Sequence, residues 1–224
     1  MFYDTALFPF TAVLAQNWRA IRAELDALNA REFIDWPEHS LYGDHGWETF
    51  GLYAFGQRQS EGCARCPQTE QLVKQIPGLM MAGFSRLAPG ARILPHRGYE
   101  GYAGYVLRVH LGLDIPEDCA LRVGTDTKGW QEGGCLVFDD SFEHEAWNRS
   151  NRTRTVLLCD FLNPLRRRPL ILNPKFTPEL IGYIESQHLP ASGIGQRLMW
   201  YLWKLANPGL VRRARSNVAR DRYS

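Results

Sequence analysis

Two histidines occupy positions in the sequence where a metal ion could be held. His96 ends the apolar run "ARILPH", and His144 comes shortly after the run "CLVFDD". Both positions are junctions between a predicted strand and a loop, where functional side chains gather on the rim of a β-sandwich. Neutral imidazole is the commonest metal ligand, and two imidazoles with open positions suit iron, zinc or copper. The pattern indicates a metal site, with purely structural histidines as the alternative.

Cationic side chains also lie among apolar residues of predicted strands. In "YAGYVLRVHLGL" the alternation of side chains places Arg108 and His110 on one face of a strand. Arg154 shares a strand face with Val156 and Leu158. An arginine that points inward needs an anionic partner, because an unpaired buried charge is costly. A bound anionic ligand would be such a partner; the alternative is a strand face turned to solvent.

The elements that must position these residues are short β-rich runs that begin near residue 80. Six of them occur within about eighty residues and are bounded by Gly, Pro and Asp: "GFSRLA", "ARILPH", "GYVLRVHLGL", "CALRVG", "CLVFDD" and "RTVLLCDFL". No helix-length insert separates them. This pattern predicts a mainly β fold with flanking helices, in which an antiparallel sandwich or barrel such as a jelly roll forms the core.

Helical patterns flank the β-rich region on both sides. The segment "LAQNWRAIRAELDALNA" places five apolar residues at helical spacing, which predicts one helix packed on the sheet: Leu14, Trp18, Ile21, Leu25 and Leu28. After Pro164, "LRRRPLILNP" reads as a connector, "TPELIGYIES" as a short helix and "GQRLMWYLWKLA" as a second helix that ends at Asn207-Pro208. We expect one domain over residues 1–164 and a helical, basic extension over residues 165–224.

Composition and charge narrow the class of protein. The 224 residues are 45% hydrophobic and 22% charged, with a net charge of +2 that gives no case for nucleic-acid binding. The charge is uneven, because the segment from Arg197 to the end has seven basic residues and one acid. Asp4 stands where a signal peptide would carry basic residues, and the apolar run "LMWYLW" is too short to span a bilayer. We expect a soluble cytoplasmic protein.

Five cysteines agree with a reducing compartment. Cys63 and Cys66 form a single CxxC pair. A zinc site would need two further ligands nearby, and a redox pair would need a βαβ context. We therefore interpret this segment as a loop rather than a functional site.

Taken together, the region from about Ser85 to Pro164 resembles the aspartyl/asparaginyl β-hydroxylase family of Fe(II)- and 2-oxoglutarate-dependent oxygenases. The resemblance is carried by "FSRLAPGARILPHRG", "LRVHLGLDIP", "WQEGGCLVFDDSFEHEAWN" and the arginine ten residues after His144. The segments "LFPF", "NWRAIRAEL" and "CPQTEQLVKQIPG" extend it to roughly residues 7–164. The family fold is a double-stranded β-helix, a jelly roll, in agreement with the strand pattern.

The resemblance implies that His96 and His144 are the iron ligands. Many iron oxygenases place a carboxylate two residues after the first histidine, but Gly98 occupies that position here, as it does in the family. Water would then fill the vacant position. Asp140 is the candidate that holds this water from the second coordination shell. Glu100, in a glycine-rich loop, is the alternative.

The resemblance also implies a site for 2-oxoglutarate. Arg154 would clamp its distal carboxylate with Ser85 beside it, while Arg108 and His110 would face its other end. A guanidinium binds a carboxylate through two parallel charge-assisted hydrogen bonds, so a dicarboxylate would account for two buried arginines in one pocket.

The implied activity is hydroxylation of an unactivated C–H bond with O2. The β-carbon of an aspartyl- or asparaginyl-type amino acid or peptide is the expected target. The chain shows no counterpart of the long helical repeat region of animal family members, which favours a small molecule or a peptide as substrate.

Three other functions stay open. The first is a lipid A acyl-chain hydroxylase at the membrane surface, with the basic, aromatic C-terminal segment in contact with anionic lipid. The competing interpretation of that segment is that four residues cover the sheet: Leu198, Tyr201, Trp203 and Leu205. The second is a halogenase, because a missing carboxylate leaves room for chloride. The third is a non-catalytic jelly-roll binding module, which the joint presence of metal ligands and arginine clamp argues against.

Overall fold

The computed structural model describes residues 1–43, 46–167, 172–186 and 194–213, and the side chains of 186 and 194–199 are not described. The strands are β1 Phe2–Tyr3, β2 Ile34–Asp35, β3 Trp47–Ala54, β4 Gln57–Arg58, β5 Leu79–Leu87, β6 Arg92–His96, β7 Val106–Asp114, β8 Cys119–Val123, β9 Asp126–Gly129, β10 Cys135–Phe138, β11 His144–Asn148 and β12 Arg154–Leu162. The helices are η1 Thr5–Leu7, α1 Phe10–Gln16, α2 Trp18–Asp26, η2 Ala30–Glu32, η3 His39–Leu41, α3 Ser60–Arg65, α4 Pro67–Val73, α5 Pro178–Ser186 and α6 Ile194–Ala206.

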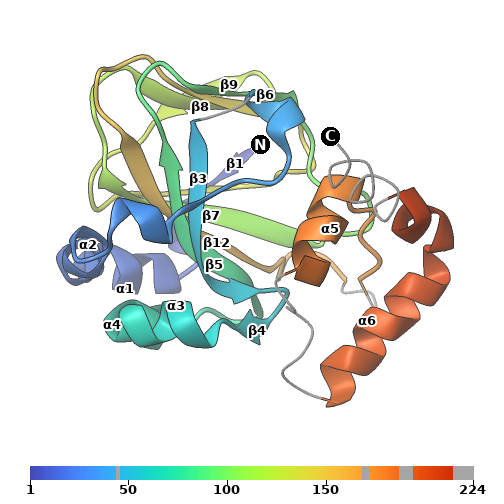
Figure 1. Cartoon of the computed structure of the whole chain (residues 1–224). Coiled ribbons are helices and arrows are strands. Elements are labelled where there is room, and N and C mark those ends of the chain that lie inside the picture. Colours follow the sequence, from blue (N-terminus) through green and yellow to red (C-terminus); the bar gives the residue numbers. More distant parts are fainter. Residues whose placement is uncertain (44–45, 168–171, 187–193, 214–224) are drawn as a thin grey trace.

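Two antiparallel sheets form the centre of the fold (Figure 1). The larger sheet has the strand order β1-β10-β7-β12-β5-β3-β2, with β4 added to β3, and the smaller sheet has the order β6-β11-β8-β9. A second buried cluster, which includes Leu87, Leu121 and Val156, joins residues of both sheets. The predicted mainly β jelly roll with flanking helices is confirmed.

The alternation predicted for β7 separates a hydrophobic face from a polar one. Leu107, Val109, Leu111 and Leu113 belong to the main hydrophobic core. His110 lies on the opposite face and is 7% exposed, and Arg108 on that face is also largely enclosed. This face is therefore turned into the protein, and the solvent-facing alternative is wrong.

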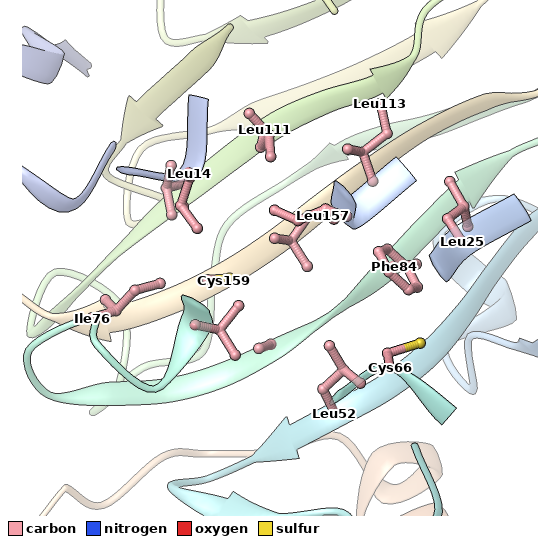
Figure 2. Close-up of a cluster of buried hydrophobic side chains, with 14 of the residues drawn as sticks. Leu14, Leu25, Leu52, Cys66, Ile76, Phe84, Leu111, Leu113, Leu157 and Cys159 are labelled. Atoms are coloured by element: carbon pink, nitrogen blue, oxygen red, sulfur yellow. The ribbon is translucent and has the colours of Figure 1, made fainter. Parts of the chain in front are cut away.

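Helices α1 to α4 cover the outer face of the larger sheet, and the main core lies between them (Figures 1 and 2). The single helix expected around Leu14 to Leu28 is instead two helices. The break is at Asn17, whose φ of −106° and ψ of 10° are not helical and whose side-chain amide donates to Val13 O at 2.8 Å. The competition of asparagine side chains with helical hydrogen bonds accounts for the break. Leu14, Ile21 and Leu25 still face the sheet, as predicted.

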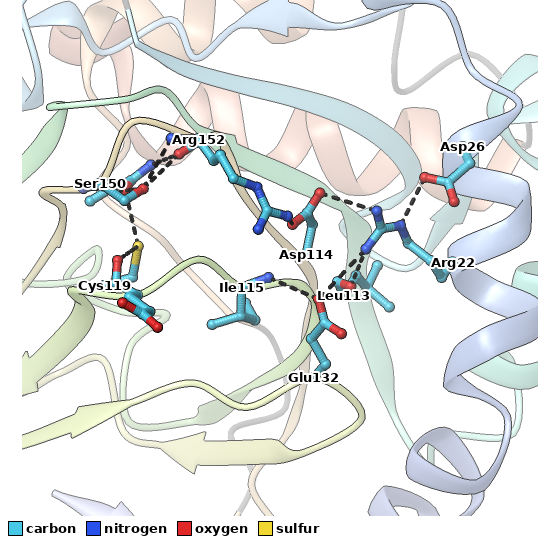
Figure 3. A network of polar contacts seen from close by, with 11 residues as sticks. Arg22, Asp26, Leu113, Asp114, Ile115, Cys119, Glu132, Ser150 and Arg152 are labelled. Atoms are coloured by element: carbon cyan, nitrogen blue, oxygen red, sulfur yellow. Dashed lines mark hydrogen bonds and ion pairs between the residues drawn. The ribbon is translucent and has the colours of Figure 1, made fainter.

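Arg22 ties α2 to the end of β7 (Figure 3). Its guanidinium donates to Asp26 Oδ1 at 2.8 Å, to Leu113 O at 2.6 Å and to Asp114 Oδ2 at 3.1 Å. Asp114 also accepts from Arg152 at 2.7 Å, so the start of β12 joins the same network. These contacts fix the positions of the two central strands that carry the candidate site residues.

The segment of Cys63 and Cys66 is helical, which corrects the expected loop. Cys63 lies in α3, Cys66 lies between α3 and α4, and both thiols are fully buried in the main core. The close approach of α3 to β3 depends on Gly62, because a Cβ there would lie 2.0 Å from Gly51 O. Burial raises the pKa of Cys63 to about 11 and that of Cys66 to about 12, which suits a packing role.

Helices α5 and α6 form at the two predicted places and share a third cluster with Phe176 and Trp203. The expectation that one face of α6 covers the sheet is wrong in part. Trp203 is buried, but it packs against Phe176, and Tyr201 and Leu205 are 56% and 60% exposed. Leu198 lies outside the described side chains. Figure 1 shows α5 between α6 and the sheet, which explains why α6 has an outward face.

Candidate active site

His96 and His144 face each other across two paired strands of the smaller sheet. His96 is the last residue of β6, His144 is the first of β11, and the two are direct register partners. Their ring centroids are 4.2 Å apart. Burial lowers the pKa of His96 and holds that of His144 well below its usual value. Both rings are thus kept in the neutral form that binds metals.

Each ring is oriented by a backbone carbonyl two residues earlier in the chain. His96 Nδ1 lies 2.8 Å from Leu94 O, and His144 Nδ1 lies 3.0 Å from Phe142 O. With Nδ1 donating to these carbonyls, Nε2 of each ring carries a free lone pair. Second-shell hydrogen bonds of this kind orient histidine ligands in metal sites.

The carboxylate of Asp140 lies against Gly98. A Cβ on Gly98 would lie only 2.6 Å from Asp140 Oδ2, so the carboxylate occupies the space of a side chain at residue 98. The backbone fixes this contact, because Gly98 N donates to Asp140 O at 2.8 Å. Asp140 is 1% exposed, and its Oδ1 has no hydrogen-bond partner among the described residues. Glu100, the alternative candidate, is exposed.

Desolvation dominates the electrostatics of Asp140. Burial raises its pKa to about 7, although Arg108, whose guanidinium lies 3.4 Å from Oδ2, acts in the opposite direction. A carboxyl group of this kind can accept or donate a hydrogen bond near neutral pH.

Arg154 is a buried cation that no carboxylate of the described residues pairs with. The side chain is 1% exposed, its Nη1 donates to Ser85 O at 3.3 Å, and its Nε has no partner. The guanidinium lies over the ring of Trp130, 4.7 Å from the centroid. Burial lowers its pKa to about 10. The charge has a cost that a bound anion would offset.

Ser85 and His110 are two further polar side chains of the cavity that contains Arg154. Ser85 is buried, and its hydroxyl accepts from Trp47 Nε1 at 3.1 Å. His110 has no partner for either ring nitrogen among the described residues, and its ring stacks on Trp130 at 6.0 Å. Trp130 Nε1 also lacks a partner there. The sequence analysis missed both tryptophans, because no spacing rule connects them with the strand residues they contact.

Arg108 differs from Arg154 in having an anionic partner within the protein. Its guanidinium donates to both oxygens of Asp160, at 2.6 Å and 2.9 Å, and Tyr102 OH donates to Asp160 Oδ2 at 3.3 Å. Arg108 and Asp160 are register partners on β7 and β12. The single acid in the apolar run "RTVLLCDFL" was a signal for this pair. A ligand anion is therefore needed to balance Arg154 but not Arg108.

The structure brings all six predicted metal and cosubstrate residues into one narrow cavity between the sheets: Ser85, His96, Arg108, His110, His144 and Arg154. A larger cleft of about 470 Å³ adjoins it and shares Trp47, Ser85, Arg108 and Leu158 with it. The cleft is lined by residues of β3 and β5, including Gly51 and Gly83, and extends to Tyr183 of α5.

The residues of the cavity fit both an Fe(II) ion and 2-oxoglutarate. Two neutral imidazoles with free Nε2 atoms are suitable iron ligands. Asp140, whose Oδ1 has no partner among the described residues, lies against Gly98, two residues after His96. Among the described residues, no group of three or more His, Cys, Asp or Glu could hold a metal by itself. A metal held by the two histidines would keep open positions, and Arg154 has the charge to hold a dicarboxylate in the same cavity.

Comparison with known proteins shows the family of this chain. Residues 15–164 match the aspartyl/asparaginyl beta-hydroxylase family, and the chain belongs to that family. An ornithine lipid ester-linked acyl 2-hydroxylase from Rhizobium tropici is 41% identical over 76% of this chain and 63% of its own length. The human aspartyl/asparaginyl beta-hydroxylase is 35% identical over 75% of this chain.

The match to the human protein spans only 23% of its length. Among solved structures, a Pseudomonas putida prolyl-4-hydroxylase is 19% identical, with a TM-score of 0.45 over 66% of this chain and 87% of that chain. In the part of the chain that the structure describes, no helix has the length and apolarity needed to cross a membrane.

Proposed function

We propose that the chain is an Fe(II)- and 2-oxoglutarate-dependent hydroxylase. The observation that carries the proposal is Arg154, a fully buried cation without a carboxylate partner in the described residues, in the same cavity as the pair His96 and His144. A buried cation and two oriented imidazoles match a cosubstrate that is both a dianion and a metal chelator. When bound, iron and 2-oxoglutarate supply the activation of O2 that hydroxylation of an unactivated C–H bond requires.

The two histidines would hold the metal through Nε2, with each ring fixed by its Nδ1 contact. Asp140 would act through water. Its carboxylate lies beside Gly98, the position where many iron sites have a third protein ligand, and its unpartnered Oδ1 would hold a water bound to the metal.

At the other end of the cavity, Arg154 would bind the distal carboxylate of 2-oxoglutarate. Ser85, fixed by Trp47, would contribute a hydroxyl donor to the same carboxylate, and His110 would contact the end of the cosubstrate nearer the metal. Arg108, held in place by Asp160, would add a positive charge at the end of the cosubstrate nearer the metal. The surrounding hydrophobic residues would exclude bulk water.

The names of the two relatives indicate which kind of C–H bond is the target. C-2 of an ester-linked acyl chain is next to the ester carbonyl, and the β-carbon of an aspartyl or asparaginyl residue is next to its side-chain carbonyl. Both names therefore describe hydroxylation of a CH2 group beside a carbonyl. We infer that this chain acts on such a carbon.

The cleft favours an acyl chain of a lipid over an amino-acid side chain. Its walls near the cavity include Met81, Gly83 and Leu158, and it continues to Ile34 at the sheet edge. An extended alkyl chain could lie there with its carbonyl end near the metal.

An aspartyl or asparaginyl peptide is the second candidate. The outer part of the cleft is polar, with Arg31, Gln59 and Glu61 in positions that suit the groups of a peptide.

The test is Fe(II)- and O2-dependent conversion of 2-oxoglutarate to succinate with a panel of acyl esters and Asp- or Asn-containing peptides. We expect turnover that depends on His96, His144 and Arg154 and is greatest with an acyl ester. Arg149→Lys is a matched control for Arg154→Lys, because Arg149 is exposed on the surface. No succinate with any substrate, together with unchanged iron binding in His96→Ala, would contradict the proposal.

A further inference from the structure

Helix α6 presents an apolar strip to solvent. Tyr201, Leu202 and Leu205 are 56%, 43% and 60% exposed. At 100° per residue these three positions fall within one arc of the helix surface of roughly 100°. They are three of the nine large hydrophobic side chains that are exposed in the described part of the chain, and they lie within five consecutive positions. Single exposed leucines are common on protein surfaces, but a strip of this kind indicates a binding surface.

The opposite side of α6 is firmly attached to the protein. Trp203 is buried, and its Nε1 donates to Pro174 O at 2.9 Å. At the end of the helix, Asn207 donates to Asn173 Oδ1 at 2.8 Å and accepts from Lys175 Nζ at 2.6 Å. The strip is therefore held in a fixed orientation and is not available for burial against the rest of the described structure.

The charge beside the strip is positive. Lys204, Arg212 and Arg213 are the charged residues of the described segment from Trp200 to Arg213, and this segment contains no acid. The sequence adds Arg197, Arg215, Arg220 and Arg222 against Asp221, so the net charge from Arg197 to the end is +6. An apolar strip followed by Lys204, Arg212 and Arg213 complements a surface that is apolar inside and anionic outside.

The strip also lies next to the element that borders the cleft. Tyr183 of α5 lines the cleft, and α5 contributes Leu180, Ile181 and Ile184 to the cluster that contains Trp203 of α6. Lys204 of α6 lies 3.8 Å from Glu185 of α5. A surface bound through α6 would thus be one helix away from the cleft (Figure 1).

We propose that α6 docks the protein on anionic lipid membranes, with the strip of Tyr201, Leu202 and Leu205 inserted among the lipids and Lys204, Arg212 and Arg213 near the headgroups. The proposal goes beyond the hydroxylase function, since it concerns a surface outside the active site. Its consequence for that function is delivery of a membrane lipid to the cleft.

The experiment is co-sedimentation of the full chain, without metal or 2-oxoglutarate, with vesicles of phosphatidylcholine alone or mixed with phosphatidylglycerol. We expect binding to the mixed vesicles that falls with added salt. Leu205→Ser should weaken this binding about tenfold. Leu7→Ser is the matched control, because Leu7 is 57% exposed on η1, away from α6, and should leave binding unchanged.

Removal of positive charges near α6 tests the electrostatic contribution to vesicle binding separately from the contribution of the apolar strip. Arg212→Gln with Arg213→Gln should weaken binding to the anionic vesicles by roughly tenfold or more. Circular dichroism and thermal unfolding establish that each variant is folded. Failure of the unaltered chain to bind the anionic vesicles would overturn the proposal, as would equal effects of Leu205→Ser and Leu7→Ser.

A second copy of the chain is the competing occupant of the strip. Self-association without vesicles that Leu205→Ser abolishes would overturn the membrane proposal in favour of a dimer. Because none of these measurements uses iron or cosubstrate, their failure leaves the hydroxylase proposal standing. Loss of 2-oxoglutarate turnover would likewise leave the docking result unaffected.

Discussion

The carboxylate of Asp140 fills the space beside Gly98 that a side chain at residue 98 would need. The two positions are 42 residues apart in sequence, and the Gly98 N to Asp140 O hydrogen bond of 2.8 Å brings their backbones together. An acid is thus brought from another strand end to the residue that stands two positions after His96. Glycine at residue 98 is what allows it to be there.

Gly98→Ala should cost about 1 to 3 kcal/mol in the free energy of unfolding, because the new methyl group collides with Asp140. In an Asp140→Ala background the same substitution should cost less, since two of its three closest contacts are with the aspartate. Denaturant unfolding of the four chains measures this coupling. Strictly additive costs would show that the two residues do not share this space.

Asp140→Ala should weaken iron-dependent succinate production about 10- to 100-fold, as expected for loss of a group that orients a metal-bound water. Glu100→Ala is the comparison, because Glu100 is exposed and should have little effect. Initial rates at saturating 2-oxoglutarate, with iron content determined for each variant, make the comparison. The reverse order would assign the role to Glu100.

Arg154→Lys should raise the Kd for 2-oxoglutarate about 10- to 100-fold, because an ammonium cannot reproduce two parallel hydrogen bonds to a carboxylate. Titration calorimetry of the Fe-free chain measures the affinity directly. Arg149→Lys should leave it unchanged.

Arg154→Met should act on stability in the opposite direction from a typical core substitution. Without cosubstrate, removal of an unpaired buried charge should raise the free energy of unfolding, on the order of 1 kcal/mol. With 2-oxoglutarate added, only the unaltered chain should gain stability. Equal stabilisation of both chains by 2-oxoglutarate in thermal unfolding would place its binding site elsewhere.

Asp160→Asn should lower the free energy of unfolding by about 3 to 5 kcal/mol, because it leaves Arg108 buried beside a neutral group. Glu32→Gln, which breaks the exposed pair with Arg65, should have a much smaller effect. Urea unfolding of the two variants compares them. A small loss for Asp160→Asn would mean that Asp140, rather than Asp160, balances Arg108.

Much of the site could be predicted because strand alternation and a family resemblance point to the same residues. Arg108 and His110 were assigned to one face of β7 from spacing alone, and that face does point into the protein. The pair of Arg108 with Asp160 was not predicted, although the lone acid of "RTVLLCDFL" needed a cation. Which of several cations it would meet depends on strand order, which local pattern does not determine.

The features of the fold that the sequence did not predict also depend on tertiary contacts, which local sequence patterns do not determine. The apolar stripe from Leu14 to Leu28 predicts the buried face of the N-terminal segment but not its break, because Asn17 is compatible with a helix until its amide finds Val13 O. From the sequence of α6 alone, Trp203 and Leu205 are equally suited to burial because both side chains are large and apolar. Only the packing of α5 against α6 decides that Trp203 is covered and Leu205 is not.

Under the proposed function, His96, His144 and Arg154 support oxygenation of a C–H bond coupled to 2-oxoglutarate. Mass spectrometry after reaction under 18O2 with Fe(II), 2-oxoglutarate and an acyl ester tests it most directly. We predict one labelled oxygen in succinate, one in the new hydroxyl group at C-2 of the ester, and neither product with His144→Ala. An unlabelled hydroxyl group, or product formation that persists in His144→Ala, would contradict the claim.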